Sequence, residues 1–140
     1  MDKHVYLIPI AMMVALTIIV WIRMFVVRLT AMKINNVHPE KMKSQQAKSL
    51  LPEEAHVPAE NFSNIFEVPI LFYVLFILLY VDAEPQLGFL IGGYLYVGLR
   101  VIHSAVALTY NKVMHRFISY LLSCLVLWVL WIAYIYQAII

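Results

Sequence analysis

The sequence has few of the residues that cross-link a chain or bind a metal ion. It contains a single cysteine, Cys124, so an internal disulfide is excluded. The paired cysteines and the H-E-x-x-H motif typical of zinc sites do not occur, and we expect no metal site. The G-x-S-x-G motif of many hydrolases is missing too. These absences exclude the common signatures of metalloenzymes and serine hydrolases.

Charge is also scarce. Charged residues make up 13% of the chain, whereas soluble domains contain about 25%. Hydrophobic residues make up 64%, a surplus that the core of a 140-residue chain is too small to bury. The net charge of +2 is too weak and too dispersed to indicate nucleic-acid binding. The composition predicts a protein embedded in membrane lipid, with no nucleic-acid partner.

Four long apolar segments account for most of this hydrophobicity. They lie at about 5–27, 58–81, 86–108 and 117–140. A helix needs about 20 residues to cross the hydrocarbon core of a bilayer, and each segment is long enough. The connection at about 28–57 is polar. We therefore predict an all-α fold in one transmembrane domain over 1–140, an integral membrane bundle of four helices.

Basic residues are concentrated on one side of this bundle. The long connection carries Arg28 and several lysines, and the connection between the third and fourth segments carries Lys112 close to Arg116. The opposite side has only Lys3. The positive-inside rule then predicts cytoplasmic basic connections and both termini on the non-cytoplasmic side.

All four glycines of the chain lie in the third segment, at Gly88, Gly92, Gly93 and Gly98. Small residues let transmembrane helices approach one another closely. We expect this segment to be a site of close helix packing.

The two middle predicted spans contain ionisable residues well inside the apolar segment. The apolar run from Glu67 to Asp82 gives about 21 Å of helix, short of the about 30 Å that the bilayer core requires. The second helix must therefore begin before Glu67 and carry it into the membrane. Arg100 lies at a matching depth in the third segment, across the turn at 82–85. Because an unpaired charge there is costly, we predict that Glu67 and Arg100 form an ion pair.

Further polar residues fall in the same leaflet as this pair. They are Asn64, His103, Tyr110, His115, Arg116 and Tyr120. One interpretation is a structural network that fixes the register of the helices. The other is a site for a polar, anionic ligand that enters from the cytoplasm. Hydrogen-bond donors outnumber the one carboxylate, Glu67, and this excess favours the ligand site.

The segments NIFEVPILF (64–72) and RVIHSAVALTYNKVMHRFISY (100–120) resemble the MAPEG superfamily, the membrane-associated proteins in eicosanoid and glutathione metabolism. The resemblance covers the second to fourth spans. It implies a homotrimer of four-helix subunits that binds glutathione as a cosubstrate in a cytoplasm-facing cleft between subunits. It further implies that lipophilic small-molecule substrates are conjugated or reduced, as by a transferase or peroxidase.

The resemblance also implies roles for individual residues. Asn64 and Glu67 match the glutathione-contacting amide and carboxylate of the family. Arg116 matches the arginine that stabilises the glutathione thiolate, which makes it the expected catalytic residue. The implied glutathione-binding set is Asn64, Glu67, Arg100, His103, Tyr110 and Tyr120.

Some positions depart from the family pattern. Glu60 and Val57 occupy the places of basic residues before the N-x-x-E pair, Ala107 that of a tyrosine, and Phe117 that of a serine. Two functions stay open: a glutathione-dependent enzyme, and a non-enzymatic membrane scaffold or binding protein of the same fold that has lost glutathione binding. A transporter is not expected, because the spans show no inverted repeat.

Overall fold

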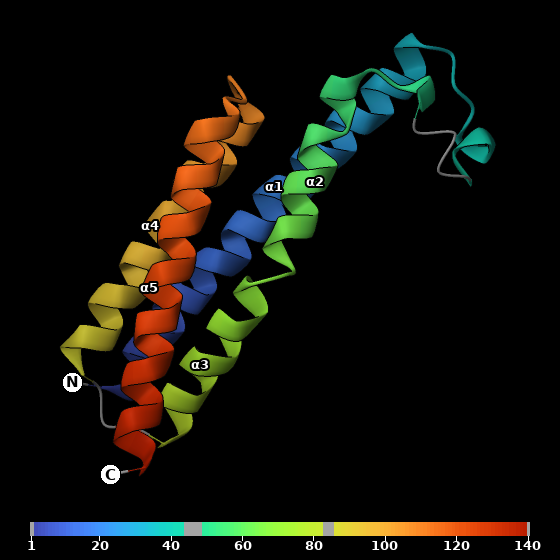
Figure 1. Ribbon diagram of the computed structural model, residues 1–140. Coiled ribbons are helices and arrows are strands. Elements are labelled where there is room, and N and C mark those ends of the chain that lie inside the picture. The colour runs from blue at the N-terminus through green and yellow to red at the C-terminus, as the bar shows by residue number, and fades with distance from the viewer. Residues whose placement is uncertain (1, 44–48, 83–85, 140) are drawn as a thin grey trace.

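The structure is a computed structural model that describes residues 2–43, 49–82 and 86–139. Figure 1 shows long helices that run up and down, with both termini at the same end of the bundle. In chain order the elements are η1 (Lys3–Tyr6), α1 (Leu7–Ile34), η2 (Pro39–Lys43), η4 (Glu53–Ala55), α2 (Val57–Ile65), α3 (Pro69–Asp82), α4 (Leu87–Leu108) and α5 (Val113–Ile139). The predicted all-α four-helix bundle is confirmed, and no strand occurs in the described ranges.

The four membrane spans differ from the sequence expectation mainly at their ends. The helical stretches long and apolar enough to cross a membrane are Lys3–Ile34, Glu53–Val81, Leu87–Leu108 and Val113–Ile139. Helix α1 continues past Val27, which shortens the connection that follows it. The turn expected at 82–85 lies largely outside the described residues.

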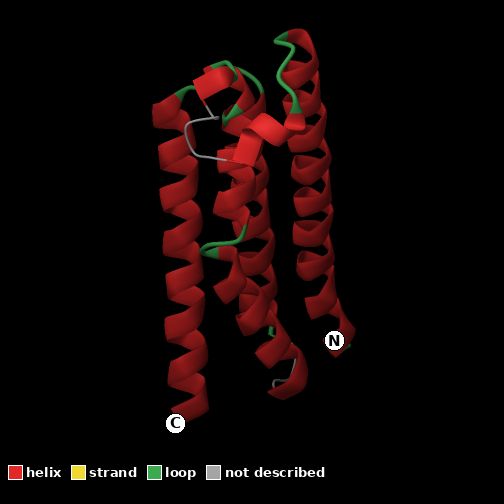
Figure 2. Cartoon of the chain, turned by 90° about the vertical axis from the view of Figure 1, so that its right-hand side faces the viewer, coloured by secondary structure: helices red, strands yellow, loops and turns green. Residues whose placement is uncertain are grey.

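The second span is broken, where the sequence predicted one continuous helix. Helix α2 ends at Ile65 and α3 begins at Pro69, and Figure 2 shows the interruption as a green loop part-way along the bundle. Proline has no N–H to donate to Ile65, and it disfavours helical geometry at the preceding residue. The chain starts a new helix instead, with the Ile70 and Leu71 N–H groups donating to the carbonyls of residues 67 and 68 at 3.4 and 3.0 Å.

Aromatic rings fill the centre of the bundle below this break. Phe72 of α3 stacks on Tyr96 of α4 with ring centroids 4.5 Å apart and planes at 12°. Phe76 lies one turn further along α3, and its ring centroid is 4.5 Å from that of Phe72. All of these side chains are fully buried. Offset stacking of this kind holds α3 against α4 through shape and ring electrostatics.

The glycines of α4 divide into two pairs. A methyl group on Gly93 would collide with the ring of Phe76, and one on Gly92 would press into the side chain of Leu130. Gly92 lets α4 approach α5 closely, and Gly93 leaves room for the Phe76 ring of α3. Gly88 and Gly98 meet nothing within 4 Å. The expected close packing is therefore found at two of the four positions.

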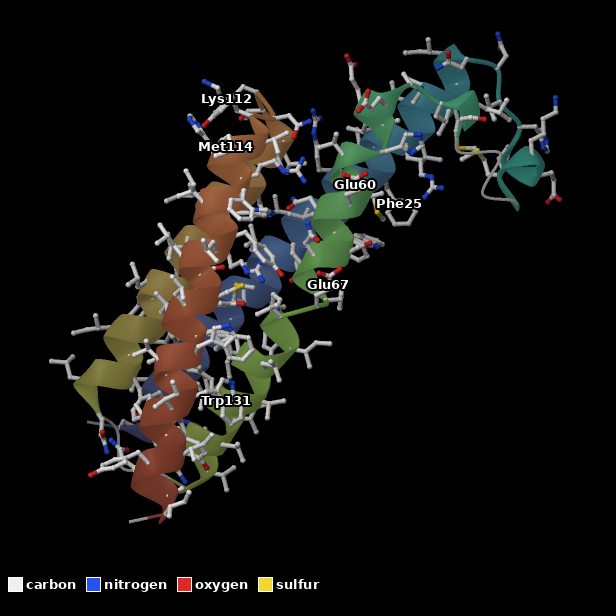
Figure 3. All side chains as sticks on the ribbon, viewed as in Figure 1. Phe25, Glu60, Glu67, Lys112, Met114 and Trp131 are labelled. Carbon is white, nitrogen blue, oxygen red and sulfur yellow. The ribbon has the colours of Figure 1, made fainter. Side chains whose placement is uncertain are left out.

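Hydrogen bonds tie the helices together at the end where the termini lie, which we call the terminal end. The Tyr6 hydroxyl accepts from the backbone N–H of Gln86, at the start of α4, at 2.8 Å. The amides of Gln86 and Gln137 exchange two hydrogen bonds of 3.2 and 3.0 Å. Trp131 lies between α5 and α3 (Figure 3) and donates to the Leu71 carbonyl at 3.2 Å. Together these contacts join all four spans.

The helices separate at the opposite end, which we call the loop end. There α1 and α2 lean away from the end of α4 and the start of α5 (Figure 1). The long connection folds back on α1, where Leu51 and Ala55 pack against Ala31 and Met32. Pro58 occupies the first turn of α2, where its missing N–H costs no helical hydrogen bond.

Candidate functional site

Arg100 lies inside the bundle rather than at its surface, with only 1% of its side chain exposed. Its Nε donates to the Tyr96 hydroxyl at 3.2 Å. The guanidinium also lies 4.8 Å from the centre of the Tyr120 ring on α5, a cation–π distance. Its Nη2 is buried and has no hydrogen-bond partner. The two N–H groups of Arg100 Nη2 are therefore left without an acceptor after both neighbouring tyrosines are engaged.

His103 follows one turn later on α4 and links that helix to α5. Its Nδ1 lies 3.0 Å from the backbone carbonyl of Arg116. Because a carbonyl oxygen only accepts, Nδ1 carries the proton, and in the neutral ring Nε2 is left as an acceptor. Nε2 is buried without a partner. The ring also faces Tyr120 with centroids 5.7 Å apart.

Asn61 of α2 is a further buried polar residue, which was not among the site residues predicted from the sequence. Its side chain is 0% exposed, and its Oδ1 accepts from the Ser104 hydroxyl of α4 at 3.4 Å. Its Nδ2 is buried without a partner. The available signal was partial: Asn61 precedes Asn64 by three residues and so shares a helix face with it.

Three buried polar atoms thus lack a partner on side chains that belong to one turn of α4 or are bonded to it through Ser104. They are Asn61 Nδ2, Arg100 Nη2 and His103 Nε2. Buried polar groups in native proteins are almost always hydrogen-bonded, so each unsatisfied group needs an explanation. A guanidinium and an amide both donate to an anionic or carbonyl oxygen, and a bare imidazole nitrogen accepts from a hydroxyl, thiol or ammonium group. We call these three side chains the polar layer.

Glu67 does not join this layer within the single chain. It lies in the break between α2 and α3 (Figure 3) and is exposed, while Asn64 is half-buried. No ion pair connects Glu67 to Arg100 among the described residues, and the predicted pair is wrong for the isolated subunit. The cause is the break itself, which takes residue 67 out of the helix on which the prediction placed it.

Arg116 lies in the first turn of α5, beside the polar layer. Its carbonyl holds His103, and its Nη1 donates to the Asn111 side-chain oxygen at 2.7 Å. Asn111 has a φ of 48°, a left-handed conformation that asparagine tolerates better than most residues. Tyr110 is exposed, and its hydroxyl lies 2.9 Å from Nδ1 of His115.

The structure therefore brings together Arg100, His103, Arg116 and Tyr120 of the expected set. Asn64 is half-buried, whereas Glu67 and Tyr110 are exposed. No group of three or more metal-ligating side chains is placed to hold an ion in the parts of the chain that are described.

The model of the MAPEG family matches residues 6–136. The chain belongs to the MAPEG family. The resemblance noted at 64–72 and 100–120 is thus confirmed and extends through the first span. Comparisons with curated proteins and with solved structures give no match. Family membership and four helices of spanning length make this MAPEG protein an integral, multi-pass membrane protein.

Proposed function

We propose that this MAPEG protein is a glutathione-dependent transferase or peroxidase that acts on lipophilic electrophiles. It works as a homotrimer with glutathione as cosubstrate. The basic connections face the cytoplasm, and both termini lie on the opposite side. The polar layer carries this proposal, because three buried groups without partners at the loop end are what a bound polar ligand would satisfy.

The charges of the site fit glutathione. The peptide has two carboxylates, an ammonium group and a thiol, and the site offers two guanidinium groups and one carboxylate. Arg100 Nη2 and Asn61 Nδ2 are the donors for a carboxylate. Glu67 is the acceptor for the ammonium group.

Arg116 has the position expected of the residue that activates the thiol. Its side chain is half-buried at the start of α5, and one of its terminal nitrogens is held by Asn111. A free thiol has a pKa of about 8.5, and a neighbouring guanidinium lowers it. Arg116 would thereby favour the reactive thiolate, whose sulfur attacks an electrophilic carbon of a substrate that arrives from the bilayer.

The exposure of Glu67 supports a site completed by a neighbouring subunit. An ionised side chain and a broken helix are tolerated at membrane depth only where protein or a water-filled cavity covers them. In the single chain the break leaves Glu67 uncovered, together with the large side chain of Phe66. A trimer contact over this face would enclose the carboxylate beside the polar layer.

The test is a glutathione titration of the purified protein, monitored through thiolate absorbance. Wild type is compared with Arg116→Ala and with the control Lys112→Ala, which removes an exposed cation from the same turn (Figure 3). We expect Arg116→Ala to raise the pKa of the bound thiol and slow conjugation about tenfold or more, because one charge-assisted hydrogen bond is lost. Glutathione affinity should fall less, and Lys112→Ala should behave as wild type.

A specific observation favours the alternative of a scaffold or binding protein without glutathione. Glu60 is exposed and lines a pocket with Glu53 and Arg28, so two carboxylates outnumber the one base where a peptide carboxylate would bind. Arg100 is enclosed by Tyr96 and Tyr120. If millimolar glutathione gives neither a saturable thiolate signal nor a rise in melting temperature, the enzyme proposal fails and the scaffold replaces it.

A further inference from the structure

A pocket other than the one lined by Glu53 and Glu60 lies at the loop end, where α1 and α2 separate from α4. Its volume is about 390 Å³, within the usual range of ligand pockets. Its walls come from three parts of the chain: α1, the segment from η4 into α2, and the end of α4 with the turn after it. The lining residues are Arg23, Val27, Glu54, Val57, Pro58 and 107–111. None of the polar-layer side chains lines it.

The depth of this pocket places it at a membrane surface. The terminal end, marked by Gln86 and Gln137, defines one boundary of the bilayer. About 20 residues of α4, the number needed to cross, lead from Leu87 to Ala107, which lines the pocket. The pocket therefore lies at the level of the lipid headgroups.

Its walls carry one charge of each sign. Arg23 of α1 and Glu54 of η4 both line the pocket and both are exposed. No ion pair joins them in the described part of the chain, so each charge is available to a ligand. Asn111 adds an amide at the rim, while Val27 and Leu108 supply apolar surface. The result is an amphipathic pocket with separated opposite charges.

We propose that this pocket binds a zwitterionic headgroup that combines a phosphate ester with an ammonium group, as in phosphatidylethanolamine. The phosphate lies against the Arg23 guanidinium and the ammonium group against the Glu54 carboxylate. The apolar walls contact the glycerol and the first acyl carbons. This proposal rests on Arg23 and Glu54 and uses neither Arg116 nor the polar layer, although Tyr110 of the implied glutathione-binding set lines the same pocket.

Charge balance selects this ligand over a purely anionic one. A ligand with only a phosphate would bring its negative charge close to Glu54, and like charges repel. A ligand with both charges satisfies both walls at once. Arginine is well suited to the phosphate, since its planar fork of donors binds two oxygens together.

A neighbouring pocket on the other face of η4 supplies matched controls. It has a volume of about 570 Å³ and carries Arg28 with two carboxylates, Glu53 and Glu60. Arg28→Gln makes the same charge change as Arg23→Gln, and Glu53→Gln the same change as Glu54→Gln. All of these side chains lie at the surface of the same segments, so the substitutions spare the core.

The experiment is native mass spectrometry of the purified protein in mild detergent, with dioleoyl phosphatidylethanolamine or dioleoyl phosphatidylglycerol added. We expect the wild type to retain phosphatidylethanolamine in preference to phosphatidylglycerol. Arg23→Gln and Glu54→Gln should each weaken that binding about tenfold, the usual effect of losing one charge-assisted hydrogen bond. Arg28→Gln and Glu53→Gln should bind as the wild type does.

A competition with free phosphoethanolamine distinguishes the two sources of the headgroup. Displacement of the lipid by phosphoethanolamine at similar concentration assigns the site to a soluble headgroup, and retention of the lipid assigns it to the membrane. Equal binding of the two lipids, equal loss in the control variants, or no retained lipid would each overturn the proposal. Circular dichroism and the melting temperature verify that every variant is folded.

Discussion

At the terminal end of the bundle the polar side chains are paired with one another, whereas at the loop end three buried polar atoms have no partner. Gln86 illustrates the first case, since its backbone N–H is held by Tyr6 and its amide by Gln137. Arg100 illustrates the second, with a buried Nη2 that donates to nothing. Both ends belong to the same helices, yet only one is complete in the single chain.

This difference separates the stability of the bundle from its capacity to bind. Paired polar groups in a membrane stabilise the fold because their alternative is an unsatisfied group in hydrocarbon. Buried polar groups without a partner do not stabilise the fold, and removing them from water costs free energy. We therefore expect substitutions at the terminal end to lower stability and substitutions at the loop end mainly to alter binding.

The largest effect is expected for Tyr6→Ala. Tyr6 is 0% exposed, sets its ring edge against Phe76 and holds the start of α4. Removing the ring leaves a cavity, and the free energy of unfolding should fall by about 3–5 kcal/mol. Denaturant unfolding in mild detergent measures this loss in free energy. Tyr6→Phe keeps the ring and should lose only about 1–3 kcal/mol. Equal losses in both variants would show that the hydrogen bond alone matters.

The second-largest loss of stability is expected in the middle of the bundle, between the terminal end and the loop end. A methyl group at Gly93 collides with the buried ring of Phe76, so Gly93→Ala should cost about 1–3 kcal/mol. Gly98→Ala, in the same helix, meets open space and should be neutral or stabilise by up to about 1 kcal/mol. Thermal unfolding of the two variants gives the comparison. A loss at Gly98 as large as at Gly93 would refute the assigned packing.

A smaller effect is expected at Asn111, in the turn of the loop end. Its φ of 48° disfavours alanine, so Asn111→Ala should cost about 1 kcal/mol, whereas Asn111→Gly should stay near wild type. Both variants remove the acceptor of Arg116, so both should reduce the glutathione thiolate signal equally. If Gly and Ala differ in that signal, Asn111 does not act through Arg116.

The smallest effect on stability is expected for Arg100→Met. Methionine has a similar length and removes an incompletely satisfied buried charge, a change that is often neutral or stabilising. The free energy of unfolding should stay within about 1 kcal/mol of wild type or rise. A loss comparable to Tyr6→Ala would show that the guanidinium is part of the structural framework, and the contrast between the two ends would disappear.

Much of the candidate site was predictable because helical spacing is regular. Arg100 and His103 are three residues apart and therefore share a face of α4. The short α4–α5 connection requires the start of α5 to return beside that face, which brings Arg116 and Tyr120 to it. Family resemblance gave the same residues their expected roles.

Two features of the site were not predictable from spacing. Glu67 was expected on a continuous helix, yet the chain stops being helical at Phe66, and the carboxylate turns outward. The burial of Asn61 was not expected, because its spacing from Asn64 puts both residues on one helix face but does not say whether that face meets lipid or protein. Its burial depends on Ser104, a residue distant in sequence.

The sequence by itself determined the membrane class, the four spans and the side of the bundle on which polar residues gather. These properties depend on composition and on segment length, which local chemistry and the bilayer thickness set. Only the tertiary structure decided which of those polar groups are satisfied, that the second span is broken, and where Arg23 and Glu54 face one pocket. Such properties depend on contacts between separate helices, and periodicity within one helix carries no information about its neighbour.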